Sequence, residues 1–143
     1  MKLLSQTLGE AENDYWPDME FPTGLVKKCF YIRKKKLKDL QPEDLRTLIT
    51  QKMSLDYAIP LAIGVLRKEV MIDAGYYPGD LLEAILKLSN SFWVQHDNMK
   101  LAFKLANLVQ ANLHEIVRFQ VSSTIKEEIL DAYSSFKENH CLS

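Results

Sequence analysis

Cysteine, glycine and proline are scarce in this sequence, with two, five and five occurrences in 143 residues. So little glycine and proline excludes a collagen-like or low-complexity chain, and no fixed-period repeat or Ser/Pro-rich linker divides the sequence. Cys29 and Cys141 stand apart without C-x-x-C spacing, which provides neither a zinc site nor a disulfide framework. We therefore expect two free thiols and a core that folds without a metal or a disulfide.

Long hydrophobic runs are also absent. The longest, Tyr57 to Leu66, contains Pro60 and Gly64 and is far shorter than the roughly 20 residues that span a bilayer. The first residues, MKLLSQTLGE, lack the apolar stretch of about 7 to 15 residues that a secretory signal requires. These absences predict a single domain, residues 1–143, that works in the cytoplasm and not in a membrane.

The signatures of common enzyme classes are missing too. The sequence has no G-x-x-x-x-G-K-[ST] phosphate loop, no G-x-G-x-x-G turn and no G-x-S-x-G nucleophile elbow. His114 and Glu115 begin like a zinc-protease helix, but Arg118 occupies the position of the second imidazole, and its cation would repel a metal. His96 and His140 have no partner at ligand spacing. We therefore predict no catalytic residues, no cofactor and no metal.

Apolar residues at helical spacing fill nearly the whole sequence, and strong strand alternation occurs nowhere. The expected fold class is all-α, a compact single-domain helical bundle or orthogonal helical array of about six helices. The six expected helices cover residues 24 to 35, a short stretch from Pro42, residues 57 to 66, a stretch from Asp80, residues 98 to 119 and a stretch from Thr124.

Several residues predict where these helices begin. Thr23 is a candidate N-cap, and Pro42 fits a first helical position, where its missing N–H is not needed. The turn at residues 75–79 precedes the fourth helix. Capping boxes, in which a polar N-cap and a carboxylate three residues later satisfy each other's backbone N–H groups, are expected at two starts. These are Asp80 with Glu83 and Thr124 with Glu127.

Two of the expected helices differ from the others in their apolar content. Residues 57 to 66 are apolar in almost every direction, which predicts a central helix enclosed by the others. Pro60 is compatible with that helix if it begins only a few residues earlier. Residues 98 to 119 carry one continuous apolar stripe, and we expect them to form the longest helix.

Charge is nearly balanced, at a formal net of −1, but unevenly distributed. Residues 1–22 form an acidic and aromatic amino-terminal arm, whereas the residues from Lys27 to Lys38 carry only basic charges, so the two blocks could pair within the chain. Alternatively, the patch from Lys34 to Lys36 could bind phosphates, as in a helical nucleic-acid-binding or regulatory adaptor. A simpler interpretation is a solvated helix end whose cations complement the helix dipole.

An ordered set of motifs lies between Pro42 and Trp93: PEDLRTLITQ, PLAIGVL, YYPGDLLEAIL and SFW. The segments TLGEAE, WP and CFYIRKKKL precede them. In this order the motifs resemble those of the contact-dependent growth inhibition (CDI) immunity proteins, CdiI, small bacterial polypeptides that neutralise a toxin domain delivered by a neighbouring cell. The resemblance covers roughly residues 5 to 95, and YYPGDLL is its most specific part.

The resemblance implies an inhibitor that acts by occlusion, without turnover. Its expected partner is the carboxy-terminal toxin domain of a cognate CdiA protein. The resemblance implies a nuclease, and in particular an RNase, whose basic cleft would attract carboxylates and aromatic anchors. Direct nucleic-acid contact is not expected. Because the shared motifs look like scaffold, the toxin-interface candidates come from the arm and the carboxy-terminal helices: Asp14, Tyr15, Trp16, Asp18, Glu20, Glu128, Asp131 and Glu138. For Tyr15 and Trp16, the alternative is that they pack the arm onto the bundle.

Overall fold

The helical spacing of apolar residues produces helices through most of the chain. The computed structural model describes residues 3–16, 21, 23–95 and 97–140. Within these residues no β-strand forms, and extended pairing is limited to two isolated antiparallel bridges, Thr7 with Lys36 and Asp73 with Pro78. The predicted all-α fold class is confirmed.

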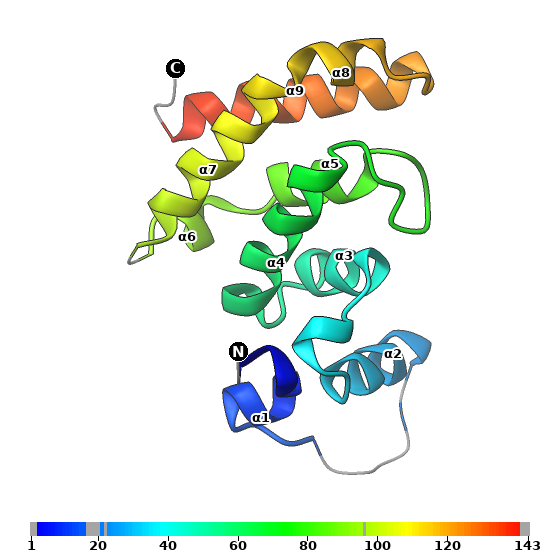
Figure 1. Cartoon of the computed structure of the whole chain (residues 1–143), viewed down its shortest axis with the longest axis vertical. Coiled ribbons are helices and arrows are strands. Elements are labelled where there is room, and N and C mark those ends of the chain that lie inside the picture. The colour runs from blue at the N-terminus through cyan, green and yellow to red at the C-terminus, as the bar shows by residue number, and fades with distance from the viewer. Residues whose placement is uncertain (1–2, 17–20, 22, 96, 141–143) are drawn as a thin grey trace.

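The six expected helices are present in the described part of the chain, together with three shorter ones (Figure 1). The expected helices are α2 (Gly24–Arg33), α3 (Pro42–Thr50), α4 (Leu55–Lys68), α5 (Asp80–Leu86), α7 (Asn98–Ala111) and α9 (Ser123–Asn139). The shorter ones are α1 (Leu8–Glu12), α6 (Asn90–Trp93) and α8 (Leu113–Arg118). Single 3-10 turns cover Leu3–Ser5 and Leu37–Asp39.

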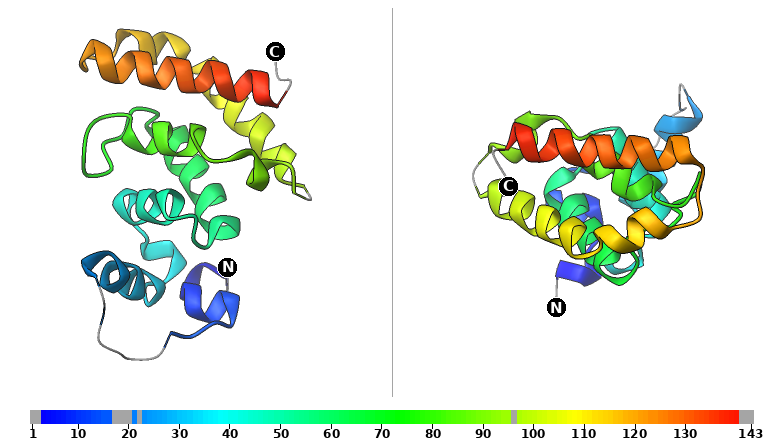
Figure 2. Two further views of the ribbon diagram at one scale, coloured as in Figure 1. Left: turned by 180° about the vertical axis from the view of Figure 1, so that it is seen from behind. Right: turned by 90° about the horizontal axis from the view of Figure 1, so that it is seen from above.

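The helices are arranged in three tiers along the long axis of the molecule (Figures 1 and 2). The first tier contains α1 and α2, the middle tier α3, α4 and α5, and the last tier α8 and α9, while α7 runs obliquely from the last tier down beside the middle tier to α6. Helix α3 packs against α4 and α5, and α5 in turn packs against α9. The first and last helices of the described chain therefore lie at opposite ends of the molecule.

One apolar core connects the three tiers. It extends from Leu8 of α1, through Leu48 of α3 and Leu81 of α5, to Trp93 and Phe136 at the far end. Each of these side chains is at most 5% exposed in this core, and burying such a group contributes roughly 1.5–3 kcal/mol. The amino-terminal arm thus shares the core of the helices that follow, because Leu8 is one of its members.

Two helix starts agree with the predictions made from the sequence. The hydroxyl of Thr23 accepts a hydrogen bond from the backbone N–H of Val26 at 3.1 Å, as an N-cap does. Pro42 is the first residue of α3. Both signals are local, and the fold leaves them unchanged.

The two predicted capping boxes are wrong. Asp80 is the first residue of α5, and its N-cap is Gly79; the Asp80 carboxylate instead accepts N–H groups from the preceding turn. The last helix begins one residue before Thr124, and its N-cap is Ser122, whose hydroxyl accepts the N–H of Ile125 at 3.2 Å. At the start of α9 the hydroxyl of Ser122 fulfils the capping role predicted for Thr124, whereas α5 begins without a side-chain cap.

The predicted long helix over residues 98 to 119 is also wrong, because it is divided at Asn112. This residue leaves helical geometry at φ −111° and ψ 12°, and its side-chain amide donates to the carbonyl of Leu108 at 2.8 Å. Val117, which the pattern placed on the buried stripe, is 47% exposed. The longest helix in the described chain is α9, with 17 residues.

Helix α4 is central but not enclosed on every side. Ala58, Ile59 and Leu66 are fully buried, whereas Pro60 and Gly64 face outward. A proline removes one backbone hydrogen bond inside a helix, and on an exposed face the freed carbonyl can bind water. Apolar residues of α4 therefore lie on its solvent-exposed face as well as on the face that packs against the other helices.

The structure also bears on the expectations about thiols and membranes. Cys29 is a free thiol on the buried side of α2, and burial raises its pKa; Cys141 lies outside the described residues. No helix in the described ranges is both long and apolar enough to cross a bilayer.

Candidate functional site

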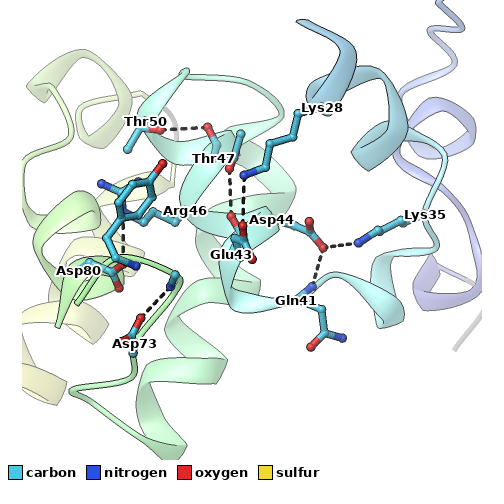
Figure 3. A network of polar contacts seen from close by, with 12 residues as sticks. Lys28, Lys35, Gln41, Glu43, Asp44, Arg46, Thr47, Thr50, Asp73 and Asp80 are labelled. Atoms are coloured by element: carbon cyan, nitrogen blue, oxygen red, sulfur yellow. Dashed lines mark hydrogen bonds and ion pairs between the residues drawn. The ribbon is translucent and has the colours of Figure 1, made fainter. Parts of the chain in front are cut away.

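The PEDLRTLI and YYPGD motifs meet in one polar network around α3 (Figure 3). Nε of Arg46 lies 3.7 Å from a carboxylate oxygen of Asp80, and its guanidinium stacks 4.2 Å from the ring centroid of Tyr76. Arg46 belongs to the first motif, and Asp80 and Tyr76 to the second. The two motifs therefore bind each other across the α3–α5 junction.

Asp80 organises the turn at residues 75–79. Its carboxylate is buried and accepts the backbone N–H groups of Ala74 at 2.7 Å and Tyr76 at 3.0 Å. Gly79 has φ 91°, and a Cβ atom built there would lie 2.6 Å from Cδ1 of Ile129. Because this positive φ favours glycine and the absence of a side chain leaves room for Ile129, the Pro-Gly-Asp sequence serves the packing of α5 against α9.

The first turn of α3 is tied to the basic block of the sequence. A carboxylate oxygen of Asp44 accepts the backbone N–H of Gln41 and the ammonium of Lys35, both at 2.9 Å. Glu43 forms a weaker, exposed ion pair with Lys28 at 3.4 Å. Figure 3 shows these contacts on the side of α3 away from Asp80. The motif residues are thus occupied in joining α2, α3 and α5.

Arg33 joins the acidic arm to the rest of the molecule. Its side chain is 6% exposed. One guanidinium nitrogen donates to Glu12 at 2.6 Å and to the hydroxyl of Ser54 at 3.2 Å, and the other donates to the backbone carbonyl of Asp14 at 2.7 Å. The ring of Trp16 lies 5.2 Å from the guanidinium carbon. The acidic and basic blocks therefore do pair within the chain at this point.

The lysine patch of the alternative adaptor hypothesis is partly engaged in internal contacts. Lys35 pairs with Asp44, and the ammonium of Lys34 lies 4.3 Å from the ring centroid of Phe30. Lys36 is exposed. Two of the three cations thus have partners inside the molecule, and phosphate binding by this patch stays a prediction.

The candidate interface residues of the arm have different surroundings. Asp14 and Tyr15 are exposed, Tyr15 by 68%, whereas Trp16 is half-buried against Arg33. Asp18 and Glu20 lie outside the described residues. Trp16 thus packs on the chain, as the alternative interpretation has it, and Tyr15 projects from it.

The candidates of the carboxy-terminal region are on one edge of α9. Glu128, Asp131 and Glu138 are all exposed, and their spacing along the helix places them on one side. Glu127 shares this side, and sequence reasoning missed it because its spacing fitted a capping box. We refer to these four residues as the acidic edge of α9. The lysines of α9 lie on the other side, where Lys126 donates to the carbonyl of Val117 at 2.6 Å.

A groove runs beside the acidic edge. It has a volume of about 570 Å³ and lies between α9 and residues 86–90, which connect α5 to α6. Glu128 and Asp131 line it together with Lys87 and His140. Sequence reasoning missed the groove and set His140 aside, because it lacked a partner at ligand spacing. We call this feature the α9 groove.

A hydrogen-bonded cluster connects the α9 groove to α5. Burial alone would raise the pKa of Glu83, but hydrogen bonds with Tyr77, Lys87 and Glu128 outweigh that effect and lower it. The bond to Glu83 raises the pKa of Glu128. Desolvation, together with the bond to Glu83, raises the pKa of the Tyr77 phenol. The rim of the groove is therefore connected to the buried Glu83 side chain of α5.

The remaining histidines do not assemble a reactive site in the described structure. His114 is exposed on α8, and His96 lies outside the described residues. No group of three or more His, Cys, Asp or Glu among the described residues is arranged to hold a metal ion. The charged side chains that form defined contacts or line a groove are those of the arm, the α3 network and the α9 groove.

These features define an all-α protein whose motif residues bind its helices to one another and whose acidic side chains face outward at both ends. The family model of the CDI immunity proteins matches residues 10–103, which is more than half of the chain. The chain belongs to this family, and the resemblance seen in its motifs is confirmed. The match leaves out the end of α7 and all of α8 and α9. Comparisons with curated proteins and with solved structures find no match.

Proposed function

We propose that this chain binds and neutralises the toxin domain of its cognate CDI system in the cytoplasm of the cell that makes both. The match of residues 10–103 to the immunity family carries this proposal. The role needs a stable binding surface and no turnover, and a helical scaffold with a continuous core supports such a surface.

The proposed target is a nuclease domain, and in particular an RNase, at the carboxyl end of a CdiA protein. A nuclease cleft must hold phosphates and is therefore basic. Its positive potential attracts the carboxylates of an inhibitor, which makes association faster and more specific. The chain would act by occluding the active site or the substrate-binding site. The candidate contacts are Asp14, Tyr15, Trp16, Asp18 and Glu20 of the arm and Glu128, Asp131 and Glu138 of α9.

The internal use of the motif residues supports a binding surface elsewhere. Arg46, Asp80 and Asp44 contribute their polar groups to contacts within the chain, so they have little to offer a partner. The exposed carboxylates of α9 belong to the part of the chain that the family model does not match. A surface outside the shared scaffold suits a protein that must recognise one particular toxin.

The test combines titration calorimetry with a growth assay, using the toxin domain encoded beside this chain. We expect nanomolar binding, rescue of growth on co-expression, and loss of the toxin's nuclease activity in the complex. As a matched variant, Lys34→Glu with Lys36→Glu should leave rescue unchanged, whereas an adaptor that uses the lysine patch would lose its activity. Failure of the folded protein to bind or to rescue would contradict the proposal.

A further inference from the structure

We propose that the α9 groove receives a basic segment of the toxin, with a lysine or arginine side chain inserted toward His140. This inference rests on the proposed function and deepens it, because it names the subsite and the chemistry of the group that fills it. It differs from the proposal of an acidic surface in general, since it requires a concave site with a polar floor.

The shape of the groove suits a short peptide segment. A volume of about 570 Å³ falls within the range of about 300–1,000 Å³ typical of ligand-binding pockets. Ser89 and Asn90 line one wall, and Ser135 and Asn139 line the other. Their hydroxyl and amide groups can exchange hydrogen bonds with the backbone of a bound segment.

The charge of the groove suits a cation. Glu128 and Asp131 contribute carboxylates, and Asp131 has no ion-pair partner within the described residues. The cation that lines the groove, Lys87, is held by the buried carboxylate of Glu83 at 2.9 Å and lies 3.8 Å from Glu128. Lys87 is thus shared between Glu83 and Glu128, and Asp131 on the opposite wall is left without a compensating cation among the described residues.

His140 gives the groove a second feature that points to a ligand. Its side chain is 93% buried, since only 7% is exposed, and it lines the groove without a hydrogen-bond partner among the described residues. The ring packs 4.8 Å from Phe136 and 6.1 Å from Trp93, measured between ring centroids. Burial lowers the pKa of this imidazole, so near neutral pH it is uncharged and offers an acceptor nitrogen. An inserted ammonium or guanidinium group can donate to that nitrogen while it pairs with the carboxylates.

The experiment uses an inactive variant of the toxin domain and calorimetry at two salt concentrations. Glu128→Gln keeps a hydrogen-bonding group beside Glu83 but removes the carboxylate, and Asp131→Asn removes the other carboxylate. We expect the double variant to weaken binding roughly tenfold or more, which corresponds to about 1.4 kcal/mol, and to reduce the dependence of binding on salt. The matched control is Glu127→Gln, since Glu127 is on the same edge of α9 but does not line the groove.

Trp93 gives an independent measurement of occupancy. The chain has two tryptophans, so Trp16→Phe leaves Trp93, beside His140, as the reporter; because Trp16 is itself a candidate contact, calorimetry first establishes the affinity of this variant for the toxin. Toxin binding should change its fluorescence, and His140→Gln should diminish that change. If the wild-type chain binds the toxin and the folded groove variants bind equally well, the groove inference fails and the proposed function stands. If the wild-type chain does not bind at all, both fail.

Discussion

At the scale of single residues, Asp80 has the clearest energetic role. Its buried carboxylate satisfies two backbone N–H groups and faces Arg46. We predict that Asp80→Ala lowers the free energy of unfolding by about 2–4 kcal/mol, because it leaves buried donors without an acceptor. Urea denaturation measures this change. Asp73→Ala is the matched control, since exposed Asp73 accepts one N–H, from Gly75 at 2.8 Å; an equal loss in both variants would contradict the role given to Asp80.

His140 predicts a pH dependence of stability. Burial lowers its pKa in the folded protein, whereas in the unfolded chain the value is about 6.5. Between these values the unfolded state binds more protons, so the free energy of unfolding falls as the pH drops below about 6.5 and recovers above it. The charged groups that line the groove with His140 are Lys87, Glu128 and Asp131.

His140→Gln should therefore flatten this part of the stability profile. Denaturation at neutral and mildly acidic pH measures the slope for the wild-type chain and the variant. The carboxylates that line the groove are the same in both proteins, so their contribution to the slope should be common to both. An unchanged slope in the variant would mean that His140 does not titrate with the folding equilibrium.

At the scale of helices, Arg33 connects α1, α2 and the start of α4. We predict that Arg33→Lys lowers the free energy of unfolding by about 1–3 kcal/mol, because a lysine keeps the charge but loses the planar fork that contacts Glu12 and Asp14. Amide hydrogen exchange should accelerate in α1 more than in α5. Lys28→Ala removes an exposed ion pair and should cost less than about 1 kcal/mol. Uniform acceleration across all helices would show that Arg33 does not act locally.

The helices illustrate what the sequence could predict and what it could not. The sequence correctly predicts Thr23 as an N-cap and Pro42 as a first helical residue, because each acts within one turn of its own helix. The capping box predicted at Asp80 was wrong because a local pattern shows neither its contact with the distant Arg46 nor the backbone N–H groups of Ala74 and Tyr76 that its carboxylate accepts. The break at Asn112 lies inside an uninterrupted apolar stripe, and asparagine is only moderately unfavourable in a helix. Asp80 thus depends on a contact with a distant residue, whereas at Asn112 the side-chain amide bonds to the carbonyl of Leu108, and apolar spacing reveals neither contact.

The candidate site was predictable only in part, for a related reason. The acidic residues of α9 could be named from their charge, and the structure places them on one exposed edge. The groove beside them is built from residues 86–90 and α9, which are about 40 residues apart in the chain. His140 gained its buried position from Trp93 and Phe136, and only folding brings these rings together.

At the scale of the whole molecule, the tiers separate the two acidic candidate surfaces. The arm with Asp14 and Tyr15 is at the end formed by α1 and α2, and the acidic edge of α9 is at the other (Figure 1). The apolar core and the α3 network lie between them. Because the two sets of candidates lie at opposite ends of the molecule, we treat them as competing hypotheses for the toxin interface.

This separation allows hydrogen exchange to choose between the two ends. We predict that formation of the toxin complex slows amide exchange in α9 and in residues 86–90, because these segments form the walls of the α9 groove. The amides of α1 and α2 should exchange at the same rate in the free and bound protein, since the middle tier keeps them away from the groove. The free protein measured under identical conditions is the reference. Protection confined to α1 and α2 would instead place the toxin on the arm, with Asp14 and Tyr15 as contacts, and would remove α9 from the interface.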